Sequence, residues 1–423
     1  MNMPAQAGSA PLRINVWGIN YSPEVTGIAP YNTELCRFLR DQGHAVRMVT
    51  SFPYYPAWKK LAGDRGRLFR SDILDGVPVH RCWHYVPSKV TTRRRILHES
   101  TFVLLSFLRQ LFLPKPDLVI VVSPPLFLGV AAWLLQRLRN CPYVFHVQDL
   151  QPDAAASLGM VRPGLFMRWL YRLEGFAYAK ASLLSGISSG MLAAFSLKGV
   201  CGSKQFYFPN GVRLELPGGV PPPGLFRARQ NLEADEFLAI YSGNLGVKQG
   251  LDVLIEAARR IKSASVKIII CGDGSQRQHL SGLIKALGTG NVLMLPLQDE
   301  DSYREMLRDA DVCLITQQRG TGQFFLPSKL LSTLAFGKPV VTVGDESSEL
   351  VKAVHEGGFG VCVPPEQPEA LAAALDELAV RPERLAAFGE AGRQYVQQFD
   401  FQSVHRRFEE AIERVARQSN GSV

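Results

Sequence analysis

The stretch LPSKLLSTLAFGKPVV, residues 326–341, contains a predicted helix start, a helix stop and the beginning of a β-strand. The pair Pro327-Ser328 is favoured at a helix N-terminus, where free backbone N–H groups and the helix dipole attract anions. Gly337 is well placed to end that helix, and the β-branched segment 339–343 then predicts a strand. A helix start beside Lys329, at the carboxyl edge of a parallel sheet, predicts a phosphate site. An ordinary loop–helix–strand unit with an exposed lysine explains this stretch alone equally well.

Strand-like and helix-like segments alternate along the whole chain. In the first half, short apolar segments predict strands at Ile14–Gly18, Ala45–Thr50, Asp117–Val122, Tyr143–Val147 and Ala181–Gly186. After a Pro- and Gly-rich connector, the predicted strands are Phe237–Ser242, Val266–Cys271, Val292–Leu295 and Val312–Thr316, and the predicted helices are Gly250–Ile261, Arg277–Leu287 and Asp299–Asp309. We therefore expect an α/β fold with two Rossmann-like, doubly wound domains, 12–208 and 209–399, facing a cleft. Residues 400–423 predict an amphipathic helix that packs back toward the first domain.

The composition is that of an ordinary globular protein. With 46% hydrophobic and 20% charged residues over 423 positions, the chain can form two cores, and extended disorder is not expected. The seven cysteines are scattered, odd in number and form no CxxC pair. This pattern argues against a disulfide framework or a structural zinc site and favours a reducing, cytoplasmic setting. Residues 1–11 lack the order of a signal peptide.

Positive charge is concentrated in the first half, where residues 1–205 carry a formal charge of +13 and the remainder carries −4. Such asymmetry suggests an anionic surface or substrate for the first half. Basic residues next to apolar ones at 89–113 favour peripheral attachment to an anionic leaflet, although a core helix with a solvated basic end also explains them. The stretch Leu118–Leu135 is long enough to span a bilayer, but Ser123-Pro124-Pro125 interrupts it. We predict a buried strand up to Val122 and a helix at Phe127–Arg139 instead.

Two polar loops of the first half follow predicted strands. Residues 17–27 join the first strand to its helix, and Gly27 lets backbone N–H groups approach an anion or a sugar. This loop contains no GxGxxG, so NAD binding is not supported. The loop His146–Asp153 brings a histidine, two carboxylates and amide groups to a strand end, where they can bind sugar hydroxyls or move a proton. Its spacing does not fit a metal site, and a structural histidine is the alternative.

The second half opens with a glycine-rich loop, Tyr241–Gly250, between a predicted strand and helix. Its glycines and Lys248 form a plausible diphosphate cradle, although the spacing is not that of a Walker A loop. Cys271–Ser275 is a second strand-end turn that fits a nucleotide-binding edge. Taken alone, this turn is better explained as a simple Asp-Gly turn.

Taken together, four segments of the chain resemble glycosyltransferase family 4, whose members have the two-domain GT-B architecture. The segments are GINYSPEVTGIAPY at 18–31, TSFPYYPAW at 50–58, SGNLGVKQGLDVLIEAA at 242–258 and LPSKLLSTLAFGKPVV at 326–341. The resemblance covers about residues 13–415 and is closest to the branch of colanic acid and O-antigen fucosyl- or N-acetylfucosaminyltransferases. No single segment is specific, but the combination is.

The resemblance implies a role for each matching residue. In that family a sugar nucleotide binds mostly to the second domain and the acceptor to the first. The implied donor contacts are Gly27, Gly243, Asn244, Lys248, Gly272, Arg319, Pro327, Ser328 and Lys329. The two lysines would neutralise the donor diphosphate, so no divalent metal or other cofactor is expected. His146 and Asp149 would position and polarise groups at the reaction centre, and the implied acceptor contacts are Tyr21, Glu24, Thr26 and Asp153.

The chain departs from the family pattern at its donor site. Many members carry two glutamates eight residues apart, and alignment on Gly337 puts Phe324 and Ser332 in their places. A common arginine of the diphosphate loop is Asn244 here. Because of these departures, the residues that would contact the sugar and the ribose of the donor are not identified, whereas the residues implied for the phosphates are present. The segment Gln317–Arg319 is a candidate to supply the missing polar contacts.

The activity that the resemblance implies is that of a retaining hexosyltransferase. It would move a sugar, such as a fucose-type deoxyhexose, from a GDP- or UDP-linked donor to a lipid-pyrophosphate-linked saccharide in exopolysaccharide or O-antigen synthesis. The usual mechanism proposed is same-face attack with the leaving phosphate as base. Such an enzyme would be cytoplasmic and peripheral on the inner face of the membrane. The alternatives are a nucleotide-sugar epimerase or phosphorylase, or an inactive sugar-nucleotide-binding scaffold; no motif supports nucleic-acid binding.

Overall fold

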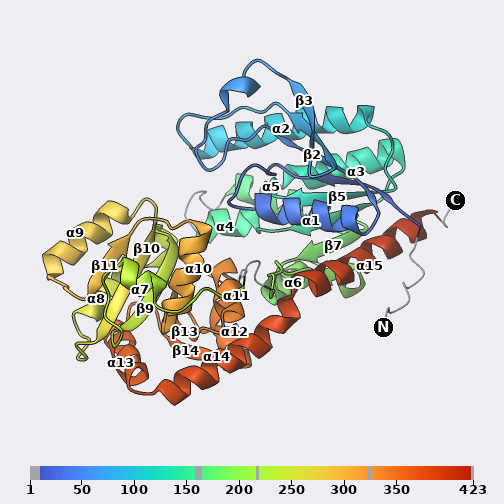
Figure 1. Ribbon diagram of the computed structural model, residues 1–423. Coiled ribbons are helices and arrows are strands. Elements are labelled where there is room, and N and C mark those ends of the chain that lie inside the picture. Colours follow the sequence, from blue (N-terminus) through green and yellow to red (C-terminus); the bar gives the residue numbers. More distant parts are fainter. Residues whose placement is uncertain (1–9, 158–163, 216–218, 323–325, 421–423) are drawn as a thin grey trace, which may run out of the picture. The chain divides into compact units, whose positions relative to one another are not determined.

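The computed structural model describes residues 10–157, 164–215, 219–322 and 326–420 (Figure 1). The chain divides into two compact units, and each is an α/β domain built on one sheet. Unit 1 comprises residues 1–209 together with 405–423, and unit 2 comprises residues 210–404. Two Rossmann-like α/β domains are therefore confirmed as the fold class.

Unit 1 contains an eight-stranded sheet in the order β3-β4-β2-β1-β5-β6-β7-β8, which is parallel except where β3 pairs with β4. Its strands are β1 (Arg13–Trp17), β2 (Ala45–Ser51), β3 (Phe69–Leu74), β4 (Val77–Cys82), β5 (Leu118–Ser123), β6 (Tyr143–Val147), β7 (Leu183–Gly186) and β8 (Gln205–Tyr207). All side chains of β5, which reads LVIVVS, are buried, as expected for a central strand of a parallel sheet.

The helices of unit 1 follow its strands in alternation. They are α1 (Ala29–Asp41), α2 (Thr92–Phe112), α3 (Phe127–Arg139), α4 (Gln151–Ser157), α5 (Leu165–Lys180) and α6 (Ser189–Leu197), with 3₁₀ turns η1 (Ala62–Asp64) and η2 (Gly202–Lys204). The long apolar stretch of the sequence is divided between β5 and α3, as predicted. Within the described ranges, no helix has both the length and the apolar character needed to cross a membrane.

Unit 2 contains a six-stranded parallel sheet in the order β11-β10-β9-β12-β13-β14. Its strands are β9 (Phe237–Asn244), β10 (Val266–Asp273), β11 (Val292–Leu295), β12 (Val312–Thr316), β13 (Val340–Val343) and β14 (Gly360–Val363). Its helices are α7 (Leu225–Arg229), α8 (Asp252–Ala258), α9 (Arg277–Leu287), α10 (Glu300–Asp309), α11 (Ser328–Ala335), α12 (Glu349–Gly357), α13 (Pro368–Ala379) and α14 (Pro382–Val396), with 3₁₀ turns η3 (Val247–Gln249) and η4 (Gln397–Phe399). Two apolar cores flank the sheet: α8, α9 and α13 pack into one, and α7, α10, α11, α12 and α14 into the other.

The last helix, α15 (Phe401–Asn420), begins in unit 2, and its residues from 405 onward belong to unit 1. Phe408, Ile412 and Ala416 recur at helical spacing and are completely buried. The ring of Phe408 stacks on that of Phe208, with a centroid distance of 3.9 Å and an interplanar angle of 5°. This helix therefore completes the core of unit 1.

Replacing Phe408 by alanine should destabilise unit 1 by about 3–5 kcal/mol, because the change removes a buried ring and leaves a cavity. Urea unfolding of the full chain should show the loss as a lower transition midpoint. Arg414→Ala, at an exposed position of the same helix, should change stability by no more than about 0.5 kcal/mol. Equal stability of the two variants would contradict the packing role of α15.

Candidate active site

The motif that opens at Leu326 forms the start of α11 in unit 2. The N-cap residue is Pro327, Ser328 begins the helix, and Gly337 follows its end with φ 64°. Ser328 is exposed, and no side chain of the described residues caps the helix. The Leu330 N–H donates to the Pro327 carbonyl at 2.9 Å, which leaves the N–H groups of Ser328 and Lys329 without a partner among the described residues.

The side chain of Lys329 lies over the end of β9. Its Nζ is 4.8 Å from the centroid of the Tyr241 ring, a cation–π contact. Within the described parts of the chain, this Nζ forms no ion pair and no hydrogen bond. Burial lowers the pKa of Lys329 to about 8. A largely desolvated ammonium without a counter-ion is costly, and it therefore attracts an anion strongly.

Two glycines at neighbouring strand ends make room for this lysine. A Cβ on Gly243 would overlap the Nζ and Cε of Lys329, and a Cβ on Gly272 would collide with the carbonyl oxygen of Gly243. The φ angles are 144° at Gly243 and 150° at Gly272, which side chains rarely adopt. The structure thus brings together three of the predicted donor residues and shows why two of them must be glycine.

Asn244 ends β9 and Lys248 lies in the following 3₁₀ turn η3, and both are exposed. The backbone of this loop is fixed, because the Lys248 carbonyl accepts a hydrogen bond from the Gln318 N–H (2.8 Å) and the Asn244 carbonyl accepts one from the Tyr241 hydroxyl (2.7 Å). Lys248 has no ion-pair partner among the described residues. Its ammonium is therefore available to a second anionic group.

Arg319 is placed differently from the other predicted donor residues. Its Nε pairs with Glu366 at 3.2 Å, and it lines a pocket of about 280 Å³ together with residues 246–247, 250–253 and 317–318. Neither Lys329 nor Gly272 lines this pocket. The residue before Arg319, Gln318, donates its N–H to the Lys248 carbonyl, so Arg319 lies next to the glycine-rich loop.

Ser332 and Phe324 stand at the two positions where many family members carry a glutamate. Ser332 lies on α11, and its hydroxyl is 3.0 Å from the Tyr303 hydroxyl and donates to the Lys329 carbonyl at 3.0 Å. A Ser–Tyr pair thus occupies the place of one expected carboxylate. Phe324 lies outside the described residues.

Glu24 in unit 1 is buried and holds two loops together. One carboxylate oxygen accepts hydrogen bonds from the backbone N–H groups of Tyr54 and Tyr55, both at 2.8 Å, and the other accepts one from Asn20 Nδ2 at 2.8 Å. Because both oxygens are engaged, Glu24 positions backbone here. The family resemblance implies that Glu24 contacts the acceptor, but in the structure its two carboxylate oxygens are engaged within unit 1.

His146 is buried in the core of unit 1. Its Nδ1 is 2.9 Å from the Ser185 hydroxyl, its Nε2 is 2.9 Å from Gln148 Nε2, and its ring contacts Phe208. Burial lowers the pKa of His146 to about 3, so the ring is neutral near pH 7. In this structure His146 is therefore a structural residue, which is the alternative left open by the sequence, whereas Asp149 is exposed at the strand end.

The remaining predicted residues of unit 1 fall into two groups. Thr26 and Gly27 are exposed on the loop before α1. Tyr21 is buried, and burial raises the pKa of its hydroxyl. Asp153 pairs with Lys198 at 2.6 Å, and that lysine also holds the buried Glu174. The structure thus leaves Thr26 and Gly27 accessible to a ligand, places Tyr21 in the core and engages Asp153 in an ion-pair network.

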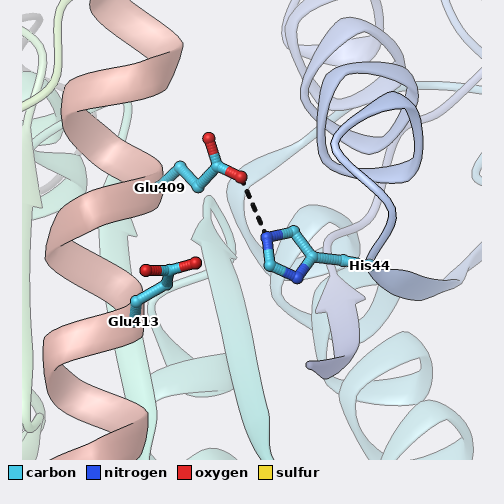
Figure 2. A group of neighbouring side chains, drawn as sticks. All are labelled: His44, Glu409 and Glu413. Atoms are coloured by element: carbon cyan, nitrogen blue, oxygen red, sulfur yellow. Dashed lines mark hydrogen bonds and ion pairs between the residues drawn. The ribbon is translucent and has the colours of Figure 1, made fainter. Parts of the chain in front are cut away.

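One group of side chains in unit 1 has a composition that could hold a metal ion. Figure 2 shows His44 facing Glu409 and Glu413 of α15, with ligand atoms within 4.8 Å of one another. The backbone N–H of Leu12 donates to His44 Nδ1 at 3.1 Å, so the remaining ring proton is on Nε2, 3.0 Å from Glu409. A neutral His44 therefore has no lone pair left for a metal, and these residues do not fit one.

Comparisons with protein families agree with this arrangement. The family model described as "Glycosyl transferases group 1" matches residues 225–395, and the "Glycosyl transferase 4-like domain" matches residues 26–211. Among solved structures, sucrose-phosphate synthase from Thermosynechococcus elongatus is similar with a TM-score of 0.74 at 17% identity, covering 95% of this chain and 98% of that one. HepE of Anabaena in complex with UDP is similar with a TM-score of 0.70 at 15% identity, covering 95% and 100%.

A curated relative extends the similarity to the sequence of nearly the whole chain. The colanic acid biosynthesis glycosyl transferase WcaI of Escherichia coli K12 is 33% identical over 407 residues, which cover 94% of this chain and 98% of that protein. With two matching family models, this identity and the shared two-domain architecture, the chain belongs to the family 4 glycosyltransferases of GT-B fold.

Proposed function

We propose that this transferase moves a sugar from a GDP- or UDP-linked donor to a lipid-pyrophosphate-linked saccharide during synthesis of an exopolysaccharide or O-antigen. The relative named for colanic acid biosynthesis supports the pathway class, and the UDP complex of HepE supports a nucleotide-linked donor. A fucose-type deoxyhexose is the sugar we favour, from the resemblance to fucosyl- and N-acetylfucosaminyltransferases.

The observation that carries the donor assignment is the ammonium of Lys329, which has no ion-pair or hydrogen-bond partner among the residues that the structure describes. It lies at the N-terminus of α11 and beside the glycine-rich ends of β9 and β10. A diphosphate offers several anionic oxygens, which suit both an ammonium and free backbone N–H groups. We therefore place the donor diphosphate at Lys329, with Ser328 and Lys248 as further contacts.

The proposed chemistry needs a group that stabilises the departing nucleoside diphosphate. Lys329 and the α11 N-terminus would neutralise the charge that develops on the leaving phosphate. We propose attack on the same face of the sugar, with retention of configuration and the leaving phosphate oxygen accepting the acceptor proton. Because cations and backbone N–H groups would do this work, we expect no divalent metal. The exposed Asp149 is the candidate for positioning the acceptor hydroxyl.

Helix α2 supports contact with a membrane-bound acceptor, because its buried face carries polar residues beside Phe102 and its exposed face carries large apolar ones. Ser106 accepts a hydrogen bond from Trp17 Nε1 (2.9 Å), and Gln110 accepts one from Asn15 Nδ2 (2.8 Å). The exposed side of α2 carries Leu97, Leu104, Leu108 and Phe112. Arg93 and Arg94 are exposed at its N-terminus. An apolar face with basic residues at its end is typical of a helix that lies in the interface of an anionic membrane.

Removal of the Lys329 charge should weaken donor binding strongly. We expect Lys329→Ala to lower affinity for UDP and GDP, by calorimetry, by about 10- to 150-fold, as for loss of a hydrogen bond to a charged group. Gly243→Ala should have a similar effect because its Cβ would displace the lysine, whereas Gly282→Ala, where a Cβ meets no other atom, should bind normally. Normal nucleotide affinity in both site variants would rule out the donor assignment.

The pH dependence of donor binding should follow the pKa of Lys329, about 8 in the free protein. Below that pH the ammonium is charged, and above it the free protein loses the charge that the diphosphate requires. UDP affinity should therefore fall by about tenfold per pH unit above pH 8 until the pKa of the complex is reached. Lys329→Ala should remove this dependence; a wild-type affinity that is constant from pH 7 to 10 would contradict the role of this lysine.

The exposed face of α2 should bind anionic vesicles. In sedimentation assays the full chain should bind phosphatidylglycerol vesicles more tightly than phosphatidylcholine vesicles, and less tightly as salt is raised. The double change Leu104→Gln and Leu108→Gln should weaken binding by about 100-fold or more, given about 1.5 kcal/mol or more for each buried leucine. Val380→Gln, at an exposed apolar position of unit 2, is the control. Equal binding of both variants would exclude α2 as the membrane face.

A product assay separates this function from its alternatives. The donor that binds is incubated with a synthetic prenyl-pyrophosphate-linked hexose, and the product is analysed by mass spectrometry and NMR. A disaccharide whose new bond keeps the anomeric configuration of the donor supports the proposal. Donor consumption without a glycosylated product would indicate an epimerase or phosphorylase instead.

A further inference from the structure

We propose that Tyr55 and Trp58, on the loop after β2, form the surface on which a pyranose ring of the acceptor saccharide binds. The inference rests on the transferase function proposed above and assigns the saccharide contact to two residues of the segment 50–58, to which no individual role has been given so far. Neither residue is among those that the family resemblance implies for the acceptor.

The topology of unit 1 places this loop at a ligand-binding edge. Strands β4, β2 and β1 are adjacent and parallel, so their carboxyl ends meet at one edge of the sheet. The loops that follow them contain residues 83–91, 52–68 and 18–28 respectively. Ligands of open parallel sheets bind at this edge, outside the carboxyl ends of the strands.

Buried polar side chains hold the loops at this edge in a fixed arrangement. Glu24 accepts the N–H groups of Tyr54 and Tyr55, as described above. Arg81 of β4 is buried and donates to the carbonyl of Ser22 at 2.5 Å and to that of Ser51 at 3.1 Å. Charge-assisted hydrogen bonds in a buried setting hold backbone strongly. The aromatic side chains of the second loop are therefore carried on an anchored backbone.

A cluster of aromatic rings packs against the side chain of Trp58. The buried Tyr54 ring lies edge-on to Trp58 (5.4 Å), His84 (4.9 Å) and His98 (4.7 Å), with distances between ring centroids. The Trp58 ring is also 5.2 Å from that of His98. Burial lowers the pKa of His98 to about 4 and lowers the pKa of His84, so both rings are neutral near pH 7. The support is therefore a packed and uncharged aromatic layer.

The outer rings of the cluster remain accessible. Tyr55 is 37% exposed, and Trp58 is partly exposed with φ 51°, a left-handed conformation that is an outlier for a bulky residue. Strained residues of this kind persist where the surrounding structure fixes them, often at ligand sites. A Cβ on Gly27 would lie 3.5 Å from the Tyr55 ring, so the exposed loop at Thr26 and Gly27 borders this surface.

The chemistry of this surface matches a saccharide. A pyranose ring has an apolar C–H face, which packs on an aromatic ring, and hydroxyls at its edge that need polar partners. Thr26 offers an exposed hydroxyl, and Asn20 is a partly exposed amide on the same loop. A buried carboxylate, Glu99, lies on α2 one residue after His98 and pairs with Arg95 at 3.1 Å. Aromatic faces bordered by a few polar groups are the usual lining of small-molecule sites.

Fluorine NMR of the full chain labelled with 5-fluorotryptophan tests the proposal directly. The chain has five tryptophans, and comparison with Trp58→Phe assigns the resonance of Trp58. Titration with methyl glycosides of fucose, galactose and glucose should shift the Trp58 resonance saturably for at least one sugar, in the high millimolar range expected of a single ring. The resonance of Trp133, which packs on Phe176 in α5, serves as the internal control. No shift of the Trp58 resonance with any of the glycosides would overturn the proposal.

Steady-state kinetics with a glycosylated acceptor provide the second readout. Trp58→Ala should raise the acceptor KM by about 2- to 10-fold, the equivalent of one aromatic contact, and leave the affinity for UDP unchanged. Trp58→Tyr should restore most of the loss, because it keeps an aromatic face. A Trp58→Ala variant that loses UDP affinity and not acceptor KM would indicate a nucleobase on this surface and overturn the proposal.

Failure of this inference is distinguishable from failure of the transferase function. UDP affinity, measured on the same samples, reports on the Lys329 site alone. If UDP binds normally and the Trp58 resonance does not shift with any glycoside, only the proposed saccharide surface is overturned. A responsive Trp58 in a chain that binds no nucleotide overturns the donor assignment and leaves the saccharide surface in place.

Discussion

The proposed donor site depends on one desolvated ammonium, that of Lys329, which has no anionic partner among the described residues. Lys329 can occupy its position only because Gly243 has no side chain there, and Gly243 can approach β10 only because Gly272 has none either. Burial of the Lys329 ammonium lowers its pKa and destabilises the charged form in the free protein. An anionic ligand that binds beside it stabilises the charged form, so the burial favours anion binding. The same lysine lies at the N-terminus of α11, so a bound diphosphate would meet both the charge and the helix dipole.

Unit 1 uses its buried charges in a different way. The carboxylate of Glu24 and the guanidinium of Arg81 form hydrogen bonds to backbone groups at the carboxyl edge of the sheet and hold that backbone in place. His146 is likewise satisfied inside the core. The aromatic rings of Tyr55 and Trp58 and the hydroxyl of Thr26 remain accessible at this edge, and these groups suit the ring and the hydroxyls of a saccharide.

The sequence predicts the fold well because each central strand of a parallel sheet is a short apolar run between turn residues. The bounds of β6, β11, β12 and α9 match their predicted residues, and α11 begins where the Pro-Ser pair indicates. The β3–β4 hairpin carries no such signal, since its strands contain Pro78 and several charged residues and depend on pairing with β2. Its strands are therefore specified by tertiary contacts and not by local pattern.

The candidate site was only partly predictable. Residue type and spacing reveal Lys329 and its glycines, because backbone conformation there demands glycine. They cannot tell that Glu24 is engaged by backbone N–H groups or that His146 is enclosed, since both depend on contacts between distant segments. The pKa of Lys329, followed by carbon NMR at Cε and assigned with Lys329→Arg, tests the central claim most directly. We predict a value near 8 in the free protein and a rise of about one unit or more with UDP bound; a pKa that UDP leaves unchanged would contradict the account.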